Sequence, residues 1–218
     1  MSTYTKQEEF WLGDFGKQYT ERNSRTDEEW DDFYKKTWGI AKLQMNELFI
    51  GYLPKNYKIL EVGCNYGLQL RGLQRMGFDQ LYGIELQSHA VEKAKELTSG
   101  INIIQGSGFD IPFKDNFFDI VCTNGVLIHI APDDLGRFMD EMYRCSKKYI
   151  WGFEYFSEDV TSVTYRGNDS FLWKADYARI FVDRFSDLKL VKKEFYPYVA
   201  EREKGIADCM YLLEKNKN

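Results

Sequence analysis

The feature that most limits the possible folds of this chain is a short apolar run that ends in a glycine-rich turn. Lys58–Val62 form the run, and Gly63-Cys64-Asn65-Tyr66-Gly67 follow it directly. Leu70, Leu73 and Met76 then recur at the spacing of one helix face. Strand, tight turn and helix in this order open a βαβ unit, which predicts a parallel sheet with helices on its faces.

The rest of the sequence continues this alternation. Helical spacing predicts helices that begin at Ser88 and Pro132 and a further helix over Trp173–Phe185. Apolar runs predict strands at Gln80–Glu85, Ile101–Gln105, Phe118–Thr123, Tyr149–Phe153, Leu188–Val199 and Asp208–Glu214. Only a short polar segment joins the last two runs, which favours an antiparallel pair at the sheet edge. The pattern predicts a doubly wound α/β fold with a mostly parallel sheet.

The first 53 residues have a different pattern, that of a helical segment. Thr26 and Glu29 fit a capping box, and aromatic and aliphatic residues recur behind them at helical spacing. This predicts one long helix, or a pair kinked at Gly39, before Pro54 closes the segment. We expect a single domain over residues 1–218, with a helical cap or lid at 1–53 and an α/β core at 54–218.

Composition excludes several classes of protein. The 218 residues include 29 Lys and Arg against 34 Asp and Glu, a formal net charge of −5, which argues against a basic groove for nucleic acid. No run approaches the roughly 20 apolar residues that a membrane helix needs, and the N-terminus has no signal-peptide pattern. Four scattered cysteines and two histidines predict no metal site. We expect a cytoplasmic protein without nucleic-acid or membrane partners; its oligomeric state stays open.

The spacing of the glycines distinguishes between nucleotide ligands. A dinucleotide fingerprint would need glycine at residues 63, 65 and 68, and residues 65 and 68 are Asn and Leu. No Walker lysine follows, so a nucleoside ligand without a pyrophosphate is favoured. Glu85 ends the second strand, where a carboxylate can accept hydrogen bonds from two ribose hydroxyls. The alternative is an exposed carboxylate at a strand end.

Four segments, in the right order and spacing, resemble class I S-adenosylmethionine-dependent methyltransferases: residues 60–67, 83–85, 106–113 and 118–121. The resemblance implies a Rossmann-like methyltransferase fold of seven strands with an antiparallel last strand. It also implies S-adenosylmethionine as cofactor and S-adenosylhomocysteine as product. Residues 7–11, 19–23, 125–130 and 165–167 look like the pseudaminic acid biosynthesis-associated methylases. That closer resemblance implies a small acceptor, a nonulosonic acid sugar or its nucleotide-activated form.

The resemblance also implies which residues bind the cofactor. They come from the cap and from the loops that follow the first four strands of the core: Trp11, Tyr19, Glu61, Gly63, Cys64, Asn65, Gly67, Glu85, Leu86, Ser107, Gly108, Phe109, Asn124 and Gly125. Two positions depart from the family pattern. Asn65 replaces the central glycine of the loop, where its amide could meet the methionine carboxylate. Ser107 replaces an acidic residue that often accepts from the adenine amine, so that contact is expected to shift to backbone groups near Gly108 and Phe109.

The acceptor is expected where the later strands end. His129 and Glu154 are candidate proton acceptors, against the alternatives of a histidine packed under the next helix and an exposed charge. Residues 154–173 form a long connection that begins at the crevice, and its Tyr155, Tyr165 and Arg166 suit a sugar acid. The alternative for Arg166 is a surface pair with Asp169.

Two other functions stay open at this point. One is an NAD-dependent sugar-modifying enzyme, disfavoured by the missing third glycine and the lack of a Tyr-x-x-x-Lys pair in the crevice region. The other is a non-catalytic S-adenosylmethionine-binding protein. The sequence does not choose between an oxygen and a nitrogen nucleophile.

Overall fold

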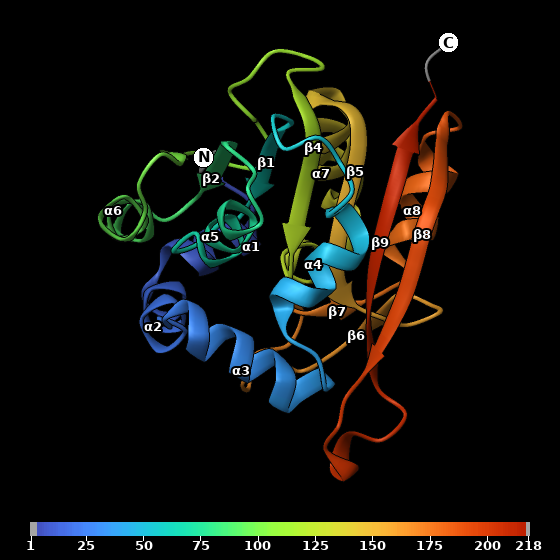
Figure 1. The fold of residues 1–218 in the computed structure, drawn as a ribbon. Helices are drawn as coiled ribbons and strands as arrows, with labels where there is room; N and C mark the ends of the chain where they lie inside the picture. The colour runs from blue at the N-terminus through green and yellow to red at the C-terminus, as the bar shows by residue number, and fades with distance from the viewer. Residues whose placement is uncertain (1–3, 217–218) are drawn as a thin grey trace.

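A seven-stranded sheet lies between two layers of helices in the computed structural model, which describes residues 4–216 (Figure 1). The strand order is β3-β2-β1-β4-β5-β9-β8. Within the described residues, only β9 runs against the other strands of this sheet, paired with β5 and β8. This confirms the predicted fold. The strands are β1 (Lys58–Val62), β2 (Gln80–Glu85), β3 (Asn102–Gln105), β4 (Phe118–Asn124), β5 (Ser146–Tyr155), β8 (Leu188–Pro197) and β9 (Ala207–Lys215).

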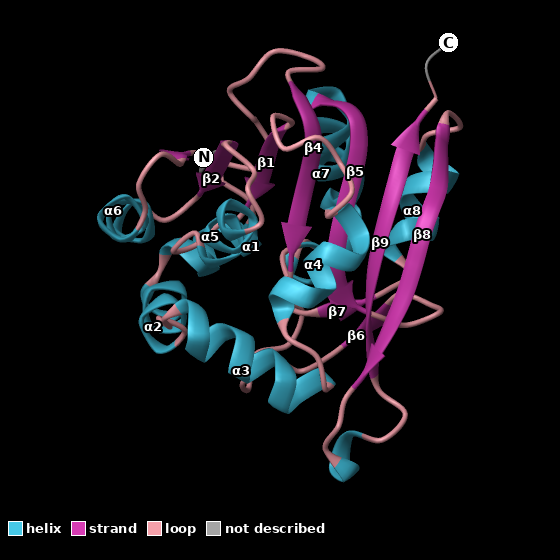
Figure 2. Cartoon of the chain, in the orientation of Figure 1, coloured by secondary structure: helices cyan, strands magenta, loops and turns pink. Residues whose placement is uncertain are grey.

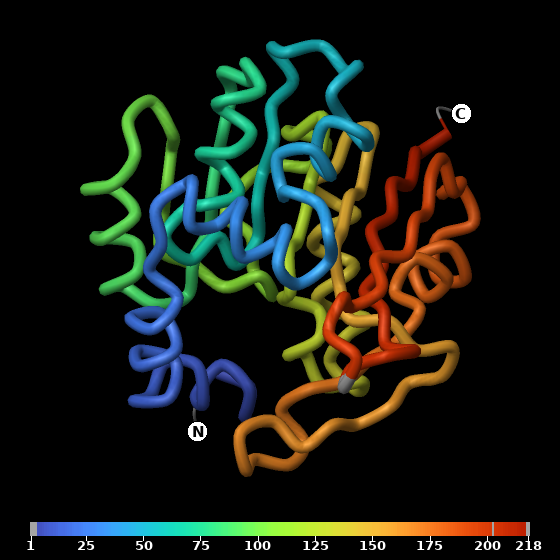
Figure 3. Tube along the Cα trace, turned by 60° about the horizontal axis from the view of Figure 1, so that its bottom comes forward, coloured from blue at the N-terminus to red at the C-terminus, as the bar shows by residue number. Residues whose placement is uncertain are grey.

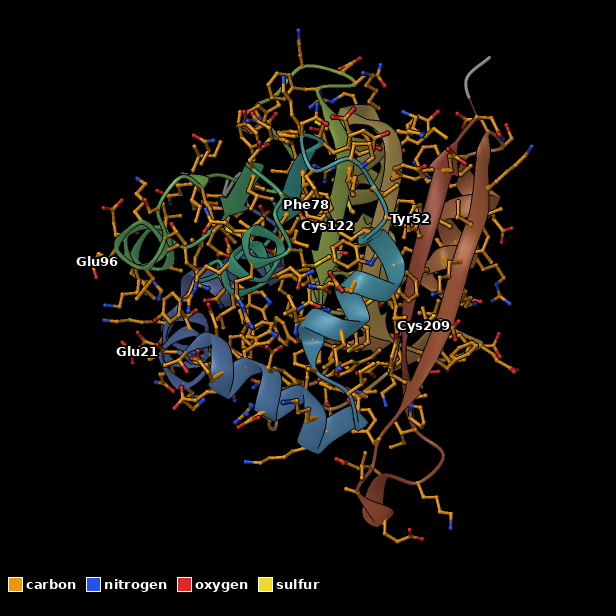
Figure 4. The ribbon with its side chains drawn as sticks, viewed as in Figure 1. Glu21, Tyr52, Phe78, Glu96, Cys122 and Cys209 are labelled. Atoms are coloured by element: carbon orange, nitrogen blue, oxygen red, sulfur yellow. The ribbon has the colours of Figure 1, made fainter. Side chains whose placement is uncertain are left out.

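Two apolar cores, one on each face, hold the helices to this sheet. On one face lie α4 (Lys42–Ile50), α5 (Leu68–Arg75) and α6 (Ser88–Leu97); on the other lie α7 (Pro132–Cys145) and α8 (Tyr177–Arg184). Figure 2 shows the sheet between these layers. Successive strand residues alternate between the cores: Ile59 and Ile120 join the first, Leu60 and Val121 the second. In Figure 4, Phe78 and Cys122 lie in the interior of the first core.

The N-terminal segment forms α1 (Lys6–Leu12), α2 (Asp14–Arg22) and α3 (Asp27–Trp38), followed by α4. The predicted capping box at Thr26 and Glu29 is present, with reciprocal hydrogen bonds of 3.2 and 2.9 Å. A second box, between Thr5 and Glu8, begins α1. Gly39 adopts φ 76° and ends α3, so the helical pattern is two helices and not one. Among the described residues, no helix is both long and apolar enough to cross a bilayer.

The predicted helix over Trp173–Phe185 begins four residues late. Trp173–Lys174 is instead the short strand β7, which pairs with β6 (Thr161–Ser162) in a separate two-stranded sheet. The Asp176 carboxylate accepts from the backbone N–H of Arg179 at 3.1 Å and so starts α8 at Tyr177. Figure 3 shows this segment and the N-terminal helices at the same end of the molecule.

Arg144, on α7, holds the irregular backbone that follows β3. Its guanidinium donates to the carbonyl oxygens of Ile111 and Phe113, both at 2.8 Å, and to the Glu141 carboxylate at 2.7 Å. Glu141 in turn accepts from the backbone N–H of Ile111 at 2.8 Å. The two side chains thus fix the far end of a loop that begins at Gly106.

Replacing Arg144 by Met should lower the free energy of unfolding by roughly 1–3 kcal/mol, because two backbone carbonyls and a carboxylate lose their donor. Urea unfolding measures the change. The control is Lys95→Met, which removes an exposed lysine paired with Glu92 on α6 and should cost no more than about 0.5 kcal/mol. Equal stability of the two variants would contradict the role given to Arg144.

Candidate functional site

A cavity of about 500 Å³ opens at the carboxyl ends of β1, β2, β4 and β5. This is where an open α/β sheet binds its ligands. Seventeen of the nineteen residues predicted from sequence line it: Trp11, Tyr19, Glu61, Gly63, Cys64, Asn65, Glu85, Leu86, Ser107, Gly108, Phe109, Asn124, Gly125, His129, Tyr155, Tyr165 and Arg166. Gly67 and Glu154 are not among the lining residues.

The turn after β1 is built from left-handed backbone. Gly63 has φ 75°, and a Cβ there would lie 2.7 Å from the Val126 side chain. Asn65 has φ 47°, a conformation that asparagine tolerates better than most residues, so it can stand where the family pattern has glycine. Its amide donates to the Thr20 hydroxyl of α2 at 3.3 Å and therefore faces the cap. Gly67 is the N-cap of α5, and a Cβ there would face Thr98 and Ile103, which lie outside the cavity lining.

Glu85 fastens this turn to the end of β2. One carboxylate oxygen accepts from the backbone N–H of Asn65 at 2.9 Å, the other from that of Gln87 at 3.0 Å. Burial raises the pKa of Glu85, and these backbone donors oppose the rise. Each oxygen keeps a lone pair for a ligand hydroxyl. Gln87 is a lining residue that the sequence did not single out, and its buried Oε1 has no partner among the described residues.

An acidic residue of α1 contacts Ser107. The Ser107 hydroxyl donates to Oε1 of Glu8, whose other oxygen accepts from the Thr5 backbone at 2.8 Å. Glu8 is buried and lines the cavity. Sequence reasoning missed it because 99 residues separate it from Ser107. The capping pattern Thr5-x-x-Glu8 was the available signal, and it indicated only a helix start.

A buried lysine of the cap reaches the end of β4. Lys42 donates to Asn124 at 2.8 Å, and the Asn124 amide donates to the Tyr34 hydroxyl at 3.4 Å. Burial lowers the pKa of Lys42 to about 7. Nearby acidic groups oppose this shift, and Glu61 opposes it most strongly. Burial has the opposite effect on the acid Glu61 and raises its pKa. The Oε2 atom of Glu61 has no partner among residues 4–216. An unpartnered acceptor therefore lines the cavity floor.

His129 lies at the cavity wall, held between aromatic rings of the cap and of the 154–173 connection. Its Nδ1 is 2.8 Å from the carbonyl oxygen of Phe171, which can only accept, so Nδ1 carries the proton and Nε2 the lone pair. Its ring centroid lies 4.6 Å from that of Trp11 and 5.2 Å from that of Tyr165. Burial lowers the pKa of His129 to about 4, so the ring is neutral at pH 7.

The expectation that Glu154 faces the acceptor pocket is wrong. Its carboxylate turns under the loop after β4 and accepts from the backbone N–H groups of Val126 at 3.2 Å and Ile128 at 3.5 Å. Burial raises the pKa of Glu154 to about 7. Period-2 alternation explains the orientation, because Phe153 and Tyr155, on either side of Glu154, are the β5 residues that line the cavity.

Asp208, at the start of β9, is a lining residue that sequence reasoning missed. It pairs in register with Tyr155 and is 1% exposed. Burial raises the pKa of Asp208 to about 7, and a hydrogen bond of 3.1 Å from the Tyr198 hydroxyl opposes the rise. Its Oδ1 has no hydrogen-bond partner among the described residues. The pairing of β9 with β5 brings it to the site, and no local motif indicates that pairing.

Arg166 lies at the exposed mouth of the cavity, with φ 49°. Asp169 accepts a hydrogen bond from Thr164 at 2.6 Å, and no ion pair joins it to Arg166 within residues 4–216. The described residues also contain no cluster of three or more His, Cys, Asp or Glu side chains placed to hold a metal ion.

Comparison with known proteins agrees with this architecture. Residues 60–149 match the model of a methyltransferase domain. Cycloartenol-C-24-methyltransferase 1 of Oryza sativa subsp. japonica is 30% identical over 48% of this chain and 33% of its own length. The chain spans less than half the length of the first curated relatives that it matches.

Solved structures share the fold. A chain from the Haloferax volcanii complex between the Trm112 methyltransferase activator and a methyltransferase superposes with a TM-score of 0.71 at 15% identity, over 98% of this chain and 99% of that one. A SAM-dependent methyltransferase of Methanosarcina mazei gives 0.63 at 17% identity, over 78% and 98%. Residues 60–149 thus match a methyltransferase-domain model, and the chain shares the fold of these solved structures.

Proposed function

We propose that this chain transfers a methyl group from S-adenosylmethionine to a small polar acceptor. The observation that carries the proposal is a row of buried hydrogen-bond acceptors along the strand ends. It runs from Glu8 beside Ser107, past Glu85 and Gln87, to Glu61. S-adenosylmethionine presents donors in a matching order: the adenine amine, two ribose hydroxyls and the methionine ammonium. The unpartnered oxygens of Gln87 and Glu61 are two of these acceptors.

Bound S-adenosylmethionine supplies an already activated methyl group, so the protein's tasks are to align the acceptor, exclude water and take up one proton. The cap suits the second task. Phe10 stacks on Phe171 at a centroid distance of 4.0 Å, and Gln7 donates to the Ser170 carbonyl at 3.3 Å. Trp11 and Tyr19 line the cavity between these contacts and the turn after β1. We propose that residues 1–53 act as a lid on the 54–218 core.

For the acceptor we propose a carbohydrate, a nonulosonic acid sugar or its nucleotide-activated form. The support is the resemblance of four segments to pseudaminic acid biosynthesis-associated methylases, together with the residues at the cavity mouth. Tyr155 and Tyr165 offer aromatic faces to a sugar ring, and Arg166 offers a bidentate partner to its carboxylate. The neutral His129 remains a candidate proton acceptor through Nε2.

Glu85→Ala should weaken S-adenosylhomocysteine binding by about 1–3 kcal/mol, because the ribose hydroxyls lose a charged acceptor. Titration calorimetry measures the affinity, and thermal unfolding checks that the variant is folded. Glu96→Ala is the control, since Glu96 is exposed on the outer face of α6 in Figure 4. Unchanged affinity in folded Glu85→Ala would remove Glu85 from the ribose site.

Glu8→Gln tests the acid that α1 brings to Ser107. The wild type should prefer S-adenosylhomocysteine over its deaminated inosyl analogue by roughly 10–100-fold, since a carboxylate accepts from the adenine amine and repels a carbonyl oxygen. In Glu8→Gln the preference should shrink, because an amide can donate as well as accept. Titration calorimetry with both ligands measures the ratio. An unchanged ratio would place the adenine amine elsewhere.

Turnover tests the acceptor. Incubation with S-adenosylmethionine and a panel of nonulosonic acid sugars, free and nucleotide-activated, should release S-adenosylhomocysteine. Arg166→Ala should lower turnover of acidic sugars at least about tenfold while cofactor affinity stays within about twofold, since Arg166 lies at the mouth. Binding of the cofactor without release for any sugar would contradict the carbohydrate acceptor, and absence of binding would contradict the proposed function itself.

A further inference from the structure

We propose that the cavity contains a second subsite, which binds a protonated amine of the acceptor at Asp208. This subsite, called here the amine pocket, consists of Asp208 and the rings of Tyr34, Trp38, Phe153 and Tyr155, all of which line the cavity. The inference rests on the proposed function and adds to it that the methylated atom is nitrogen.

The place of the pocket follows from the strand order. The acceptors proposed for the cofactor lie at β1, at β2 and after β3, with Asn124 at the end of β4. Phe153 and Tyr155 end β5, and Asp208 begins β9, one strand further along. Neighbouring strands lie about 4.8 Å apart, so Asp208 lies about 10 Å from β4. This is the side of the cavity that the cofactor groups leave free.

Asp208 has an unused hydrogen-bond acceptor that an amine would fill. Its Oδ2 accepts from Tyr198 at 3.1 Å, while Oδ1 has no partner although the residue is 1% exposed. The buried indole N–H of Trp38 comes near enough to the same carboxyl to lower its pKa, but it makes no hydrogen bond of good geometry among the described residues. A buried carboxylate oxygen without a donor is costly, because burial removes its hydrogen bonds to water. A ligand N–H that reaches Oδ1 replaces them.

The rings around Asp208 favour a cation over a neutral hydroxyl. Tyr34 and Trp38 lie 4.6 Å apart between centroids, and Trp38 meets Phe153 edge-on at 5.4 Å. Aromatic faces attract an ammonium group, and more strongly where water is excluded. Phe153 already has such a partner on Lys42, whose Nζ lies 4.5 Å from the ring centroid.

Other charges also face the pocket. Lys42 and Lys174 are its cationic neighbours, and Glu61, Glu154 and Asp208 are its acids. Lys42 is bound to Asn124, and burial holds its pKa near 7, so it does not neutralise all three carboxyls. Lys174 lies outside the cavity lining, 5.8 Å from the Tyr155 centroid. Burial raises the pKa of each of these three carboxyls, so a bound cation would favour their charged forms.

Asp208 would also move the proton that nitrogen must lose. The bound ammonium gives one proton to Oδ1, which frees the nitrogen lone pair to form the new carbon–nitrogen bond. The electrons of the broken methyl–sulfur bond stay with sulfur, and the proton on Asp208 returns to solvent as product leaves. With a pKa of about 7, Asp208 suits this exchange near neutral pH.

The test is the indole N–H resonance of Trp38 in ¹H–¹⁵N spectra, assigned with Trp38→Phe and recorded with saturating S-adenosylhomocysteine. The probes are two matched pairs: glucosamine with glucose, and ethanolamine with ethylene glycol. We expect the amines to shift the resonance saturably and the hydroxyl partners to bind at least tenfold more weakly. Asp208→Asn, which keeps the shape and removes the charge, should lose at least tenfold in amine affinity and leave S-adenosylhomocysteine affinity within about twofold. Asp183→Asn, on α8 and outside the cavity lining, is the matched control.

The outcomes separate the inference from the proposed function. Equal binding of amine and hydroxyl probes, no shift with either amine, or unchanged amine affinity in Asp208→Asn each overturns the amine pocket while cofactor binding stands. Failure of the wild type to bind S-adenosylhomocysteine overturns the proposed function. Because the comparison of amine and hydroxyl uses wild-type protein, it decides the matter even where Asp208→Asn does not fold.

Discussion

The site depends on one interaction, the hydrogen bond by which the Glu85 carboxylate holds the backbone after β1. The turn has left-handed backbone at Gly63, Asn65 and Gly67. Glu85 accepts from the N–H of Asn65 and, with its other oxygen, from that of Gln87. The same carboxylate thereby links the turn after β1 to the segment that follows β2. Its burial is tolerated because backbone donors satisfy it.

The helical cap makes hydrogen bonds to the loops at the strand ends of the core. Thr20, fully buried on α2, accepts hydrogen bonds from the side-chain amides of both Asn65 and Gln87. The cap is therefore in direct contact with the turn after β1. Glu8 places a carboxylate over Ser107, and Lys42 reaches Asn124 at the end of β4. Each contact joins the cap to a different strand end.

The buried acidic side chains of the cavity wall favour a cationic ligand. Glu61, Glu85 and Asp208 line it, while Lys42 is the buried cation that opposes them. Burying a carboxylate is expensive unless it is paired, so an excess of buried acids is stable only where backbone groups or a ligand satisfy them. Glu85 and Glu154 are satisfied by backbone, whereas Glu61 and Asp208 each keep a free oxygen. Those two oxygens are the points at which a cationic ligand gains most.

The sequence by itself determined the layers of the fold and most of the cavity wall. Local patterns predicted the layers because the strand–turn–helix at 58–76 fixes a parallel unit, and the carboxyl ends of parallel strands meet at one edge. The family resemblance supplied most of the individual lining residues. Tertiary structure alone decided the rest. Which way Glu154 points depends on the register of β5, and Asp208 reaches the cavity only because β9 inserts antiparallel beside that strand. Glu8 meets Ser107 only because α1 folds back over the core. Short-range periodicity carries information about faces and turns, whereas contacts between residues about a hundred positions apart follow from packing of the whole chain.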